Sequence, residues 1–295
     1  LYTEMVTADA IIHGDQERLL WESPGLAPTA LQLGGSDPDK LARATAIGAS
    51  WGYGEINLNC GCPSSRVQSG AFGACLMAEP DLVADCVTAM REATDVPITV
   101  KCRIAIDDLP ARETLFTFID TVTAAGCTQF TVHARKAWLK GLSPKENREV
   151  PPLDYALVAD LKAERPDLSI TLNGGITTIE ECRAHLKVFD GVMLGRAAYQ
   201  NPSLLGHVDS ELFGAGAPIS PHDALRAYRP YMTERLAAGT GLHAMTRHML
   251  GLFNGQPGAR AWRRILSERA PKPGAGLDVL DAAVAAIMEQ AVSVD

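Results

Sequence analysis

The sequence lacks any stretch of about 18 consecutive apolar residues, the length that a transmembrane helix needs. It also lacks a basic segment leading into an apolar run near its beginning, which is the pattern of an export signal. We therefore expect neither a membrane protein nor an exported one.

Cysteine patterns typical of disulfide frameworks and zinc sites are absent too. Seven cysteines, an odd number, are scattered over 295 residues, which argues against a disulfide framework. Cys60 and Cys62 are separated by one residue, but no second pair follows at zinc-finger spacing, so no metal site is expected. With 46% hydrophobic and 21% charged residues, we expect a cytoplasmic globular enzyme.

The formal net charge of −8 would normally count against a nucleic-acid partner. The charges are unevenly placed, however. Residues 243–273 contain one acid, Glu268, and six basic residues: Arg247, Arg260, Arg263, Arg264, Arg269 and Lys272. This basic patch is suited to binding an anionic partner.

Short apolar runs recur along the first two thirds of the chain, each followed by a helical pattern. Seven strands are predicted, at residues 1–6, 30–35, 55–61, 98–104, 130–134, 170–175 and 191–196. Asp37 before Pro38 marks one helix start, and Thr178 with Glu181 forms a capping box at another. Alternating strands and helices predict a parallel sheet.

Polar residues or glycines occur near the carboxyl ends of these strands: Gln32, Asn57, Asn59, Lys101, Arg103, His133, Arg135, Asn173, Gly195 and Arg196. This pattern is typical of an α/β protein built as a (β/α)8 TIM-type barrel, whose active site lies at that end. An open α/β sheet is the alternative. Because the chain starts directly in the first of seven strands, we expect that an eighth strand and its helix, the first βα unit, are missing from the sequence.

After about residue 206 the alternation stops, and Gly and Pro become frequent in residues 213–221. Only helical patterns follow, at residues 223–236, 244–252, 259–266 and 277–292. We predict a barrel domain at residues 1–212 and a small all-α domain at residues 213–295.

The run FGACLM at residues 72–77 closes a loop that begins with NLNCGCPS at residue 57. Small residues around Cys75 would let its thiol approach a flat ligand, and the preceding glycines would let backbone groups face that ligand. Alternatively, Cys75 is a small buried hydrophobic residue, the common fate of a free cysteine.

Two further features suggest a site for an anionic ligand. Asn173, Gly174 and Gly175 end one strand and Gly195 and Arg196 end the next, where barrels commonly bind phosphate. Lys101 lies within an apolar strand and needs an anion. Reduced flavin would supply one, and a neighbouring carboxylate is the alternative. His133 is either a site residue or a hydrogen-bonded core histidine.

Taken together, six segments resemble the tRNA-dihydrouridine synthases, most closely the A type. They are EINLNCGCPS, GAFGACLM, VKCRI, TVHARKAWLKGLSPKENREVPPL, NGGI and GVMLGRAAYQNP, and the resemblance runs from Leu1 to about Ser267. It implies that FMN lies across the top of the barrel and that the helical domain helps to hold tRNA.

The resemblance assigns roles to individual residues. It implies FMN contacts at Gln32, Lys101, His133, Asn173, Gly174, Gly175, Gly195 and Arg196, with Asn59 near the ring. It implies a catalytic acid at Cys75 and tRNA contacts at Phe72, Lys145, Arg148, Arg260 and Arg263. The alanine-proline-methionine run of the family's first strand is absent, so we expect weakened FMN binding and incomplete barrel closure in this chain.

The implied reaction reduces the C5–C6 double bond of a uridine in the D loop of tRNA. NADPH would reduce FMN, hydride would pass to C6, and Cys75 would protonate C5. We expect a monomer. The alternatives are an FMN barrel acting on a free pyrimidine-like small molecule, against which the basic patch argues, and an RNA-binding protein that has lost catalysis.

Overall fold

The structure is a computed structural model that describes residues 1–21, 28–64 and 70–292. Its contacts divide the chain into two compact units. The first unit consists of residues 1–175 and 185–193, and the second of residues 176–184 and 194–295. The predicted domains 1–212 and 213–295 remain a prediction, and the units are described separately below.

The first unit is built on seven parallel strands in sequential order. They are β1 (Val6–Thr7), β2 (Ala30–Gly34), β3 (Glu55–Cys60), β4 (Ile98–Arg103), β5 (Gln129–His133), β6 (Ser169–Asn173) and β7 (Gly191–Met193). Within the described residues the predicted number of strands is confirmed, and this order with intervening helices is the topology of a TIM-type barrel. The first strand is shorter than expected, because Leu1 to Met5 contribute only the isolated bridge of Tyr2 with Ala30.

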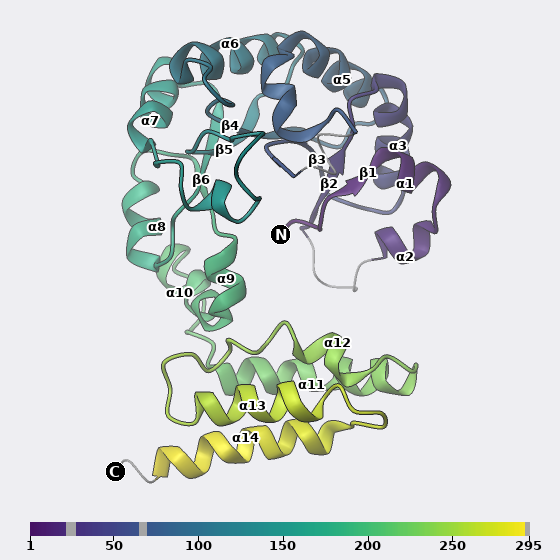
Figure 1. The fold of residues 1–295 in the computed structure, drawn as a ribbon, viewed down its shortest axis with the longest axis vertical. Coiled ribbons are helices and arrows are strands. Elements are labelled where there is room, and N and C mark those ends of the chain that lie inside the picture. The colour runs from purple at the N-terminus through teal and green to yellow at the C-terminus, as the bar shows by residue number, and fades with distance from the viewer. Residues whose placement is uncertain (22–27, 65–69, 293–295) are drawn as a thin grey trace. The chain divides into compact units, whose positions relative to one another are not determined.

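Helices and 3-10 helices connect the strands of this unit. They are α1 (Ala8–His13), α2 (Gln16–Leu20), α3 (Pro38–Ser50), α5 (Pro80–Glu92), α6 (Ala111–Ala124) and α7 (Tyr155–Glu164), with the 3-10 helices η1 (Gly73–Ala78) and η2 (Glu146–Arg148). Figure 1 shows α3, α5, α6 and α7 in an arc outside the strands.

The strand sequences alternate between two kinds of side chain, and the register aligns them. Leu31 pairs with Ile56, and Val100 pairs with Phe130, so apolar side chains share the face covered by helices. The neighbouring positions are polar, as where Asn59 pairs with Lys101. Since successive side chains of a strand point to opposite faces, the other face of the sheet is lined with polar groups.

Two predicted helix starts are confirmed. The Asp37 carboxylate accepts a hydrogen bond from the Lys40 backbone N–H at 3.1 Å, and Pro38 occupies the first turn of α3. At α8 (Ile179–His185), Thr178 Oγ1 accepts from the Glu181 N–H and the Glu181 carboxylate accepts from the Thr178 N–H, both at 3.1 Å. This reciprocal pair is a capping box.

The second unit is mainly helical. Besides most of α8 it contains α9 (Arg196–Gln200), η3 (Pro202–His207), α10 (Val208–Leu212), α11 (Pro221–Ala237), α12 (Leu242–Thr246), α13 (Ala259–Arg269) and α14 (Leu277–Val292). Trp262 of α13 is fully buried in its core, against Phe253 at a ring-centroid distance of 4.8 Å. Among the helices of the described residues, none combines the length and the apolar character needed to span a bilayer.

The predicted helix at residues 244–252 is confirmed only over residues 244–246, because α12 ends at Thr246 and turns follow. Within these turns, Gly251 lies against another segment. A side chain there would place its Cβ 1.9 Å from the carbonyl oxygen of Gln200, so the backbone approaches α9 closely. Such an approach requires glycine, which is itself a poor helix former.

Candidate functional site

The polar face of the sheet contains a chain of hydrogen-bonded side chains. Gln32 Nε2 donates to Asn57 Oδ1 at 2.9 Å, and Asn59 Nδ2 donates to Gln32 Oε1 at 2.8 Å. Asn59 Oδ1 in turn accepts the backbone N–H groups of Gly61 and Cys62, both at 3.0 Å. The predicted site residues Gln32 and Asn59 are therefore brought together and held by the loop that follows β3.

Lys101 extends from β4 on the same face. Its ammonium donates to Asn173 Oδ1 at 3.0 Å, and Asn173 Nδ2 donates to the Met193 carbonyl at 2.8 Å. Burial, and then the neighbouring charge of Arg103, lower the pKa of Lys101 to about 8. Among the described residues no carboxylate pairs with this ammonium, so the carboxylate-pair interpretation is not supported.

Arg103, two residues further along β4, is 2% exposed and joins the loop after β3 to the loop between β5 and α7. Its guanidinium donates to the carbonyls of Gly61, Lys136 and Asn147 at 2.9 to 3.0 Å. Burial lowers the pKa of Arg103 to about 10. The sequence marked this arginine only as a polar strand end, and its role in holding the loops became apparent from the geometry.

His133 and the glycines after β6 lie against each other. Gly174 has a φ of +114°, and a Cβ there would lie 2.6 Å from Cδ2 of the His133 ring. Gly175 has a φ of +75°, and the Tyr155 hydroxyl donates to the Gly174 carbonyl at 2.5 Å. The sequence therefore places glycine where both the backbone conformation and the space require it.

Cys75 lies in η1, and its thiol is partly exposed. The thiol donates to the carbonyl of Phe72 at 3.1 Å, and burial raises the pKa of Cys75. Ala71 and Gly73 both have positive φ, at 52° and 75°, so the backbone is sharply bent where it enters η1. The thiol is held in its protonated form at neutral pH.

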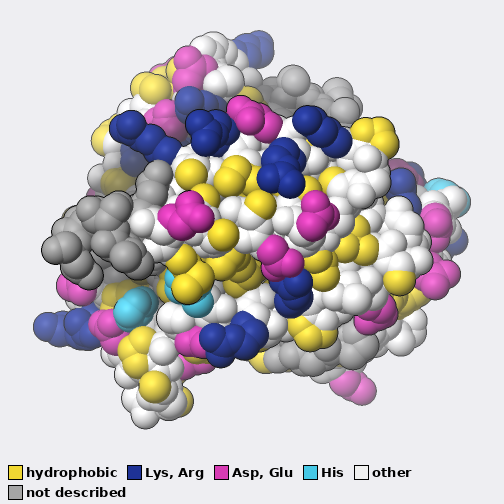
Figure 2. All heavy atoms as spheres, turned by 90° about the horizontal axis from the view of Figure 1, so that it is seen from below, with side chains coloured by type: hydrophobic (Ala, Val, Ile, Leu, Met, Phe, Trp, Pro, Cys, Tyr) yellow, Lys and Arg dark blue, Asp and Glu magenta, His cyan; other side chains and the backbone are white. Residues whose placement is uncertain are grey.

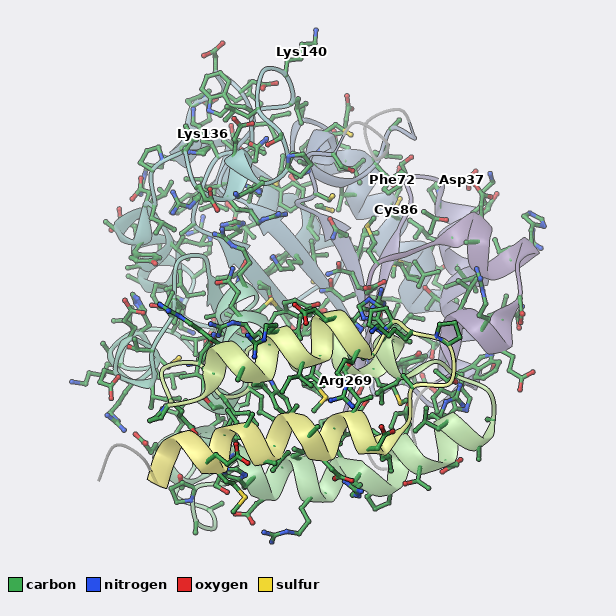
Figure 3. The ribbon with its side chains drawn as sticks, turned by 60° about the horizontal axis from the view of Figure 1, so that its bottom comes forward. Asp37, Phe72, Cys86, Lys136, Lys140 and Arg269 are labelled. Carbon is green, nitrogen blue, oxygen red and sulfur yellow. The ribbon has the colours of Figure 1, made fainter. Side chains whose placement is uncertain are left out.

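Phe72 is only 9% exposed. A Cβ at Gly34, where β2 ends, would lie 2.7 Å from its ring, so the ring packs directly against this glycine. Figure 3 labels Phe72 within the first unit. Its predicted tRNA contact stays a prediction.

Lys145 and Arg148 are exposed residues at and within η2, on a long loop between β5 and α7. Between them Asn147 is fully buried. Its Oδ1 accepts the Trp138 N–H at 2.7 Å, and its Nδ2 donates to the Trp138, Leu142 and Ser143 carbonyls at 2.9, 3.2 and 3.4 Å. Figure 3 shows Lys136 and Lys140 of the same loop. Sequence reasoning missed Asn147. Its buried amide, which lies between two charged residues, holds the loop in shape.

Gly195 and Arg196 belong to the second unit, where Gly195 precedes α9 and Arg196 is its exposed first residue. Gly195 has a φ of −121° and open space at its Cβ position, so the structure does not itself require glycine there. The predicted phosphate site shared with residues 173–175 stays a prediction.

Some arginines of the basic patch interact with neighbouring side chains. Arg263 donates to Asn254 Oδ1 at 2.7 Å, and Arg260 is exposed on the same helix. Arg269 lies near α14 and is 3.8 Å from the Asp278 carboxylate (Figure 3). The face of the molecule in Figure 2 intersperses basic, acidic and apolar side chains, so positive charge is not segregated there. Arg260 and Arg263 remain the candidates for phosphate binding.

Within the described ranges, no three His, Cys, Asp or Glu side chains are grouped so that they could hold a metal ion. What the polar face offers instead is a buried cation, amide N–H donors and a glycine backbone. Such a donor set suits a planar ligand that carries carbonyl oxygens and an anionic group.

Comparison with known proteins agrees with this chemistry. The family model described as dihydrouridine synthase matches residues 1–289. A tRNA-dihydrouridine(20/20a) synthase of Xanthomonas axonopodis pv. citri is 58% identical over 285 residues, covering 96% of this chain and 85% of that protein. Proteins with the same name from Vibrio parahaemolyticus and Vibrio cholerae are 56% and 55% identical, and they cover 98% and 100% of this chain and 89% and 90% of their own lengths.

Proposed function

The chain belongs to the dihydrouridine synthase family, and we propose that it reduces uridine to 5,6-dihydrouridine in the D loop of tRNA, with FMN bound and NADPH as the reductant. The match over residues 1–289 carries the assignment of the reaction. A cytoplasmic location and a monomeric state remain predictions from the sequence.

The residues at the strand ends fit FMN. The buried ammonium of Lys101, which has no carboxylate partner among the described residues, suits the negative charge of reduced flavin near N1 and O2. Gln32 and Asn59 supply amide N–H groups for its ring carbonyls, and His133 with Asn173, Gly174 and Gly175 forms the adjoining wall. Gly195 and Arg196 are proposed to complete a phosphate site.

When bound and reduced, the flavin supplies the hydride that adds to C6 of the uracil. The resulting enolate over C5, C4 and O4 needs a proton at C5. The Cys75 thiol is protonated and partly exposed, so its S–H bond can break as the new C5–H bond forms. Water then returns a proton to the thiolate.

The tRNA contacts are proposed for exposed groups in both units. Lys145 and Arg148 lie on the loop that Asn147 organises, and Arg260 and Arg263 lie on α13. A uridine in a loop can leave its stack at lower cost than one in a duplex, which suits a reaction on the face of a flat ring.

The test incubates the purified chain, FMN and NADPH with tRNA that lacks dihydrouridine. We expect a mass increase of about 2 Da per modified uridine, because reduction adds two hydrogens. Cys75→Ala should bind FMN and oxidise NADPH with an artificial acceptor while forming almost no dihydrouridine. Cys182→Ala, the same change on α8, is the matched control. Full activity of Cys75→Ala would exclude Cys75 as the acid.

A further inference from the structure

Below the proposed flavin site, the chain of side-chain hydrogen bonds continues to a carboxylate. Asn57 Nδ2 donates to Thr99 Oγ1 at 2.8 Å, and the Thr99 hydroxyl donates to Glu55 Oε1 at 2.5 Å. The Tyr2 hydroxyl donates to the same oxygen at 2.8 Å. Side chains of β3, of β4 and of the segment before β1 are thus linked, and the proposed reaction uses none of them directly.

The Glu55 carboxylate at the end of this series of hydrogen bonds determines which group donates in each bond. An ionised carboxylate only accepts hydrogen bonds, so the hydroxyl of Thr99 must donate to Glu55. That leaves the Thr99 oxygen to accept, which requires Asn57 to present its NH₂ group to it. Asn57 then presents its carbonyl oxygen to Gln32, and Gln32 presents its own carbonyl oxygen to Asn59.

Burial makes this direction robust. Asn57 is fully buried and Thr99 is 4% exposed, so water cannot substitute for a missing partner. Tyr2 remains a hydroxyl donor because burial, followed by the hydrogen bond to Glu55, raises the pKa of its phenol. Reversing any one amide would therefore place an acceptor against an acceptor, or a donor against a donor, at each of its neighbours.

We propose that Glu55 is a positioning residue that holds the amide of Asn57 and, through it, the amide of Gln32, so that Gln32 offers an N–H donor to the carbonyl-bearing edge of the flavin. At the other end of the series the Gly61 and Cys62 N–H groups orient the Asn59 amide in the same sense. The bonds within the chain use one N–H of each NH₂ group and leave the second available within the described residues. Glu55 acts through Thr99 and Asn57 and contacts neither cofactor nor substrate. The inference rests on the proposed FMN site.

The experiment interrupts the series of side-chain hydrogen bonds at Thr99. Thr99→Val keeps the shape of the side chain but cannot accept from Asn57, so the Asn57 NH₂ group loses its partner and Asn57 holds Gln32 less firmly. Thr99→Ser keeps the hydroxyl. We expect Thr99→Val to raise the Kd of the 295-residue apoprotein for FMN about tenfold, the effect of losing about one hydrogen bond, and to lower the flavin reduction potential. Thr99→Ser should stay within about threefold of wild type.

Two further variants separate this role from simple loss of stability. Thr45→Val is the matched control, because Thr45 is fully buried on α3 and its hydroxyl has no hydrogen-bond partner among the described residues. It should leave the Kd and potential unchanged. Glu55→Met removes the terminal acceptor and should reproduce Thr99→Val, whereas Glu55→Gln keeps a carbonyl oxygen able to accept both hydroxyls and should restore most of the affinity.

The outcomes distinguish the two proposals. Wild-type protein that binds no FMN would contradict the proposed cofactor and this inference with it. Wild-type protein that binds FMN, with Thr99→Val and Thr99→Ser equal in Kd and potential, would overturn the positioning role alone, even if Thr99→Val lowered the melting temperature.

Discussion

The ammonium of Lys101 on β4 donates to the side-chain oxygen of Asn173 on β6, 3.0 Å away. The partner is a neutral amide, so it orients the lysine without neutralising it. The positive charge therefore stays uncompensated in a buried position, where an anionic ligand can pair with it. Keeping this charge buried lowers the free energy of unfolding of the apoprotein.

Replacing Lys101 with methionine should therefore stabilise the apoprotein while impairing FMN binding. A lysine pKa lowered from 10.5 to about 8 corresponds to about 3 kcal/mol at neutral pH. Losing the hydrogen bond to Asn173 offsets about 1 kcal/mol of this gain. We expect net stabilisation of about 2 kcal/mol by urea unfolding at pH 7.

The pH dependence follows from the sign of the shift. Between about pH 8 and pH 10.5 the unfolded chain binds a proton at Lys101 that the folded chain does not. The wild-type apoprotein therefore gains stability relative to Lys101→Met as the pH rises through this window. A stability difference that is constant from pH 7 to about 10.5 would contradict the lowered pKa.

Gly174→Ala should disturb the site at His133. The new methyl group would lie 2.6 Å from the ring, at a φ of +114° that alanine avoids. We expect a loss of about 2 to 4 kcal/mol in stability and a weaker FMN complex. Gly52→Ala is the control, because Gly52 also has positive φ, 88°, but has open space around it. Equal losses in both variants would show that the collision with His133 has no effect.

Cys75 should give activity that is insensitive to pH through the neutral range. Because burial raises its pKa, the acid form persists, and the alkaline decline in kcat lies above the usual thiol range. Single-turnover rates of uridine reduction from about pH 6 to 8 should vary little on account of this group. A decline within that range that Cys75→Ser abolishes would indicate a lowered thiol pKa instead.

Asn147→Ala should loosen the loop that bears Lys145 and Arg148. The substitution removes four side-chain hydrogen bonds at a fully buried amide, which we expect to destabilise the protein by about 2 to 4 kcal/mol. The KM for tRNA should rise about tenfold, and FMN affinity should change little. Lys140→Ala, an exposed change on the same loop, is the control. An unchanged KM would mean that the loop does not contact tRNA.

Arg260→Ala combined with Arg263→Ala should raise the KM for tRNA and leave NADPH oxidation with an artificial acceptor unchanged. For each arginine that binds a phosphate, its removal should flatten the plot of log affinity against log salt by roughly 0.7. Arg18→Ala with Arg43→Ala removes the same charge from exposed positions of the first unit. Identical salt slopes for the two double variants would exclude a specific role for α13.

The sequence predicted the seven strands and two helix caps because these depend on local signals. Alternation of apolar residues, Pro38 after Asp37, and the pairing of Thr178 with Glu181 all act over a few positions. The helix predicted at residues 244–252 extends too far, because α12 ends at Thr246, and at Gly251 the distant carbonyl of Gln200 leaves no room for a side chain. No local pattern in the sequence contains that contact.

The candidate site shows the same division. Polar residues at strand ends marked Gln32, Asn59, Lys101 and His133, since parallel strands bring their carboxyl ends together. No sequence pattern distinguished Glu55, Thr99 or Asn147, whose partners lie 4 to 53 residues away. Side chains that orient other side chains are defined by pairings across the sheet and loops, which a single sequence does not display.

The sequential order of β1 to β7 affects how the first unit folds while the chain is synthesised. Each strand pairs with the strand before it in the chain, so every new pairing closes only the connection between two consecutive strands. Contacts of this kind form without waiting for a remote segment to be synthesised. The hydrogen-bond ladder can therefore grow from its amino-terminal side during translation, with β7 the last strand to be added.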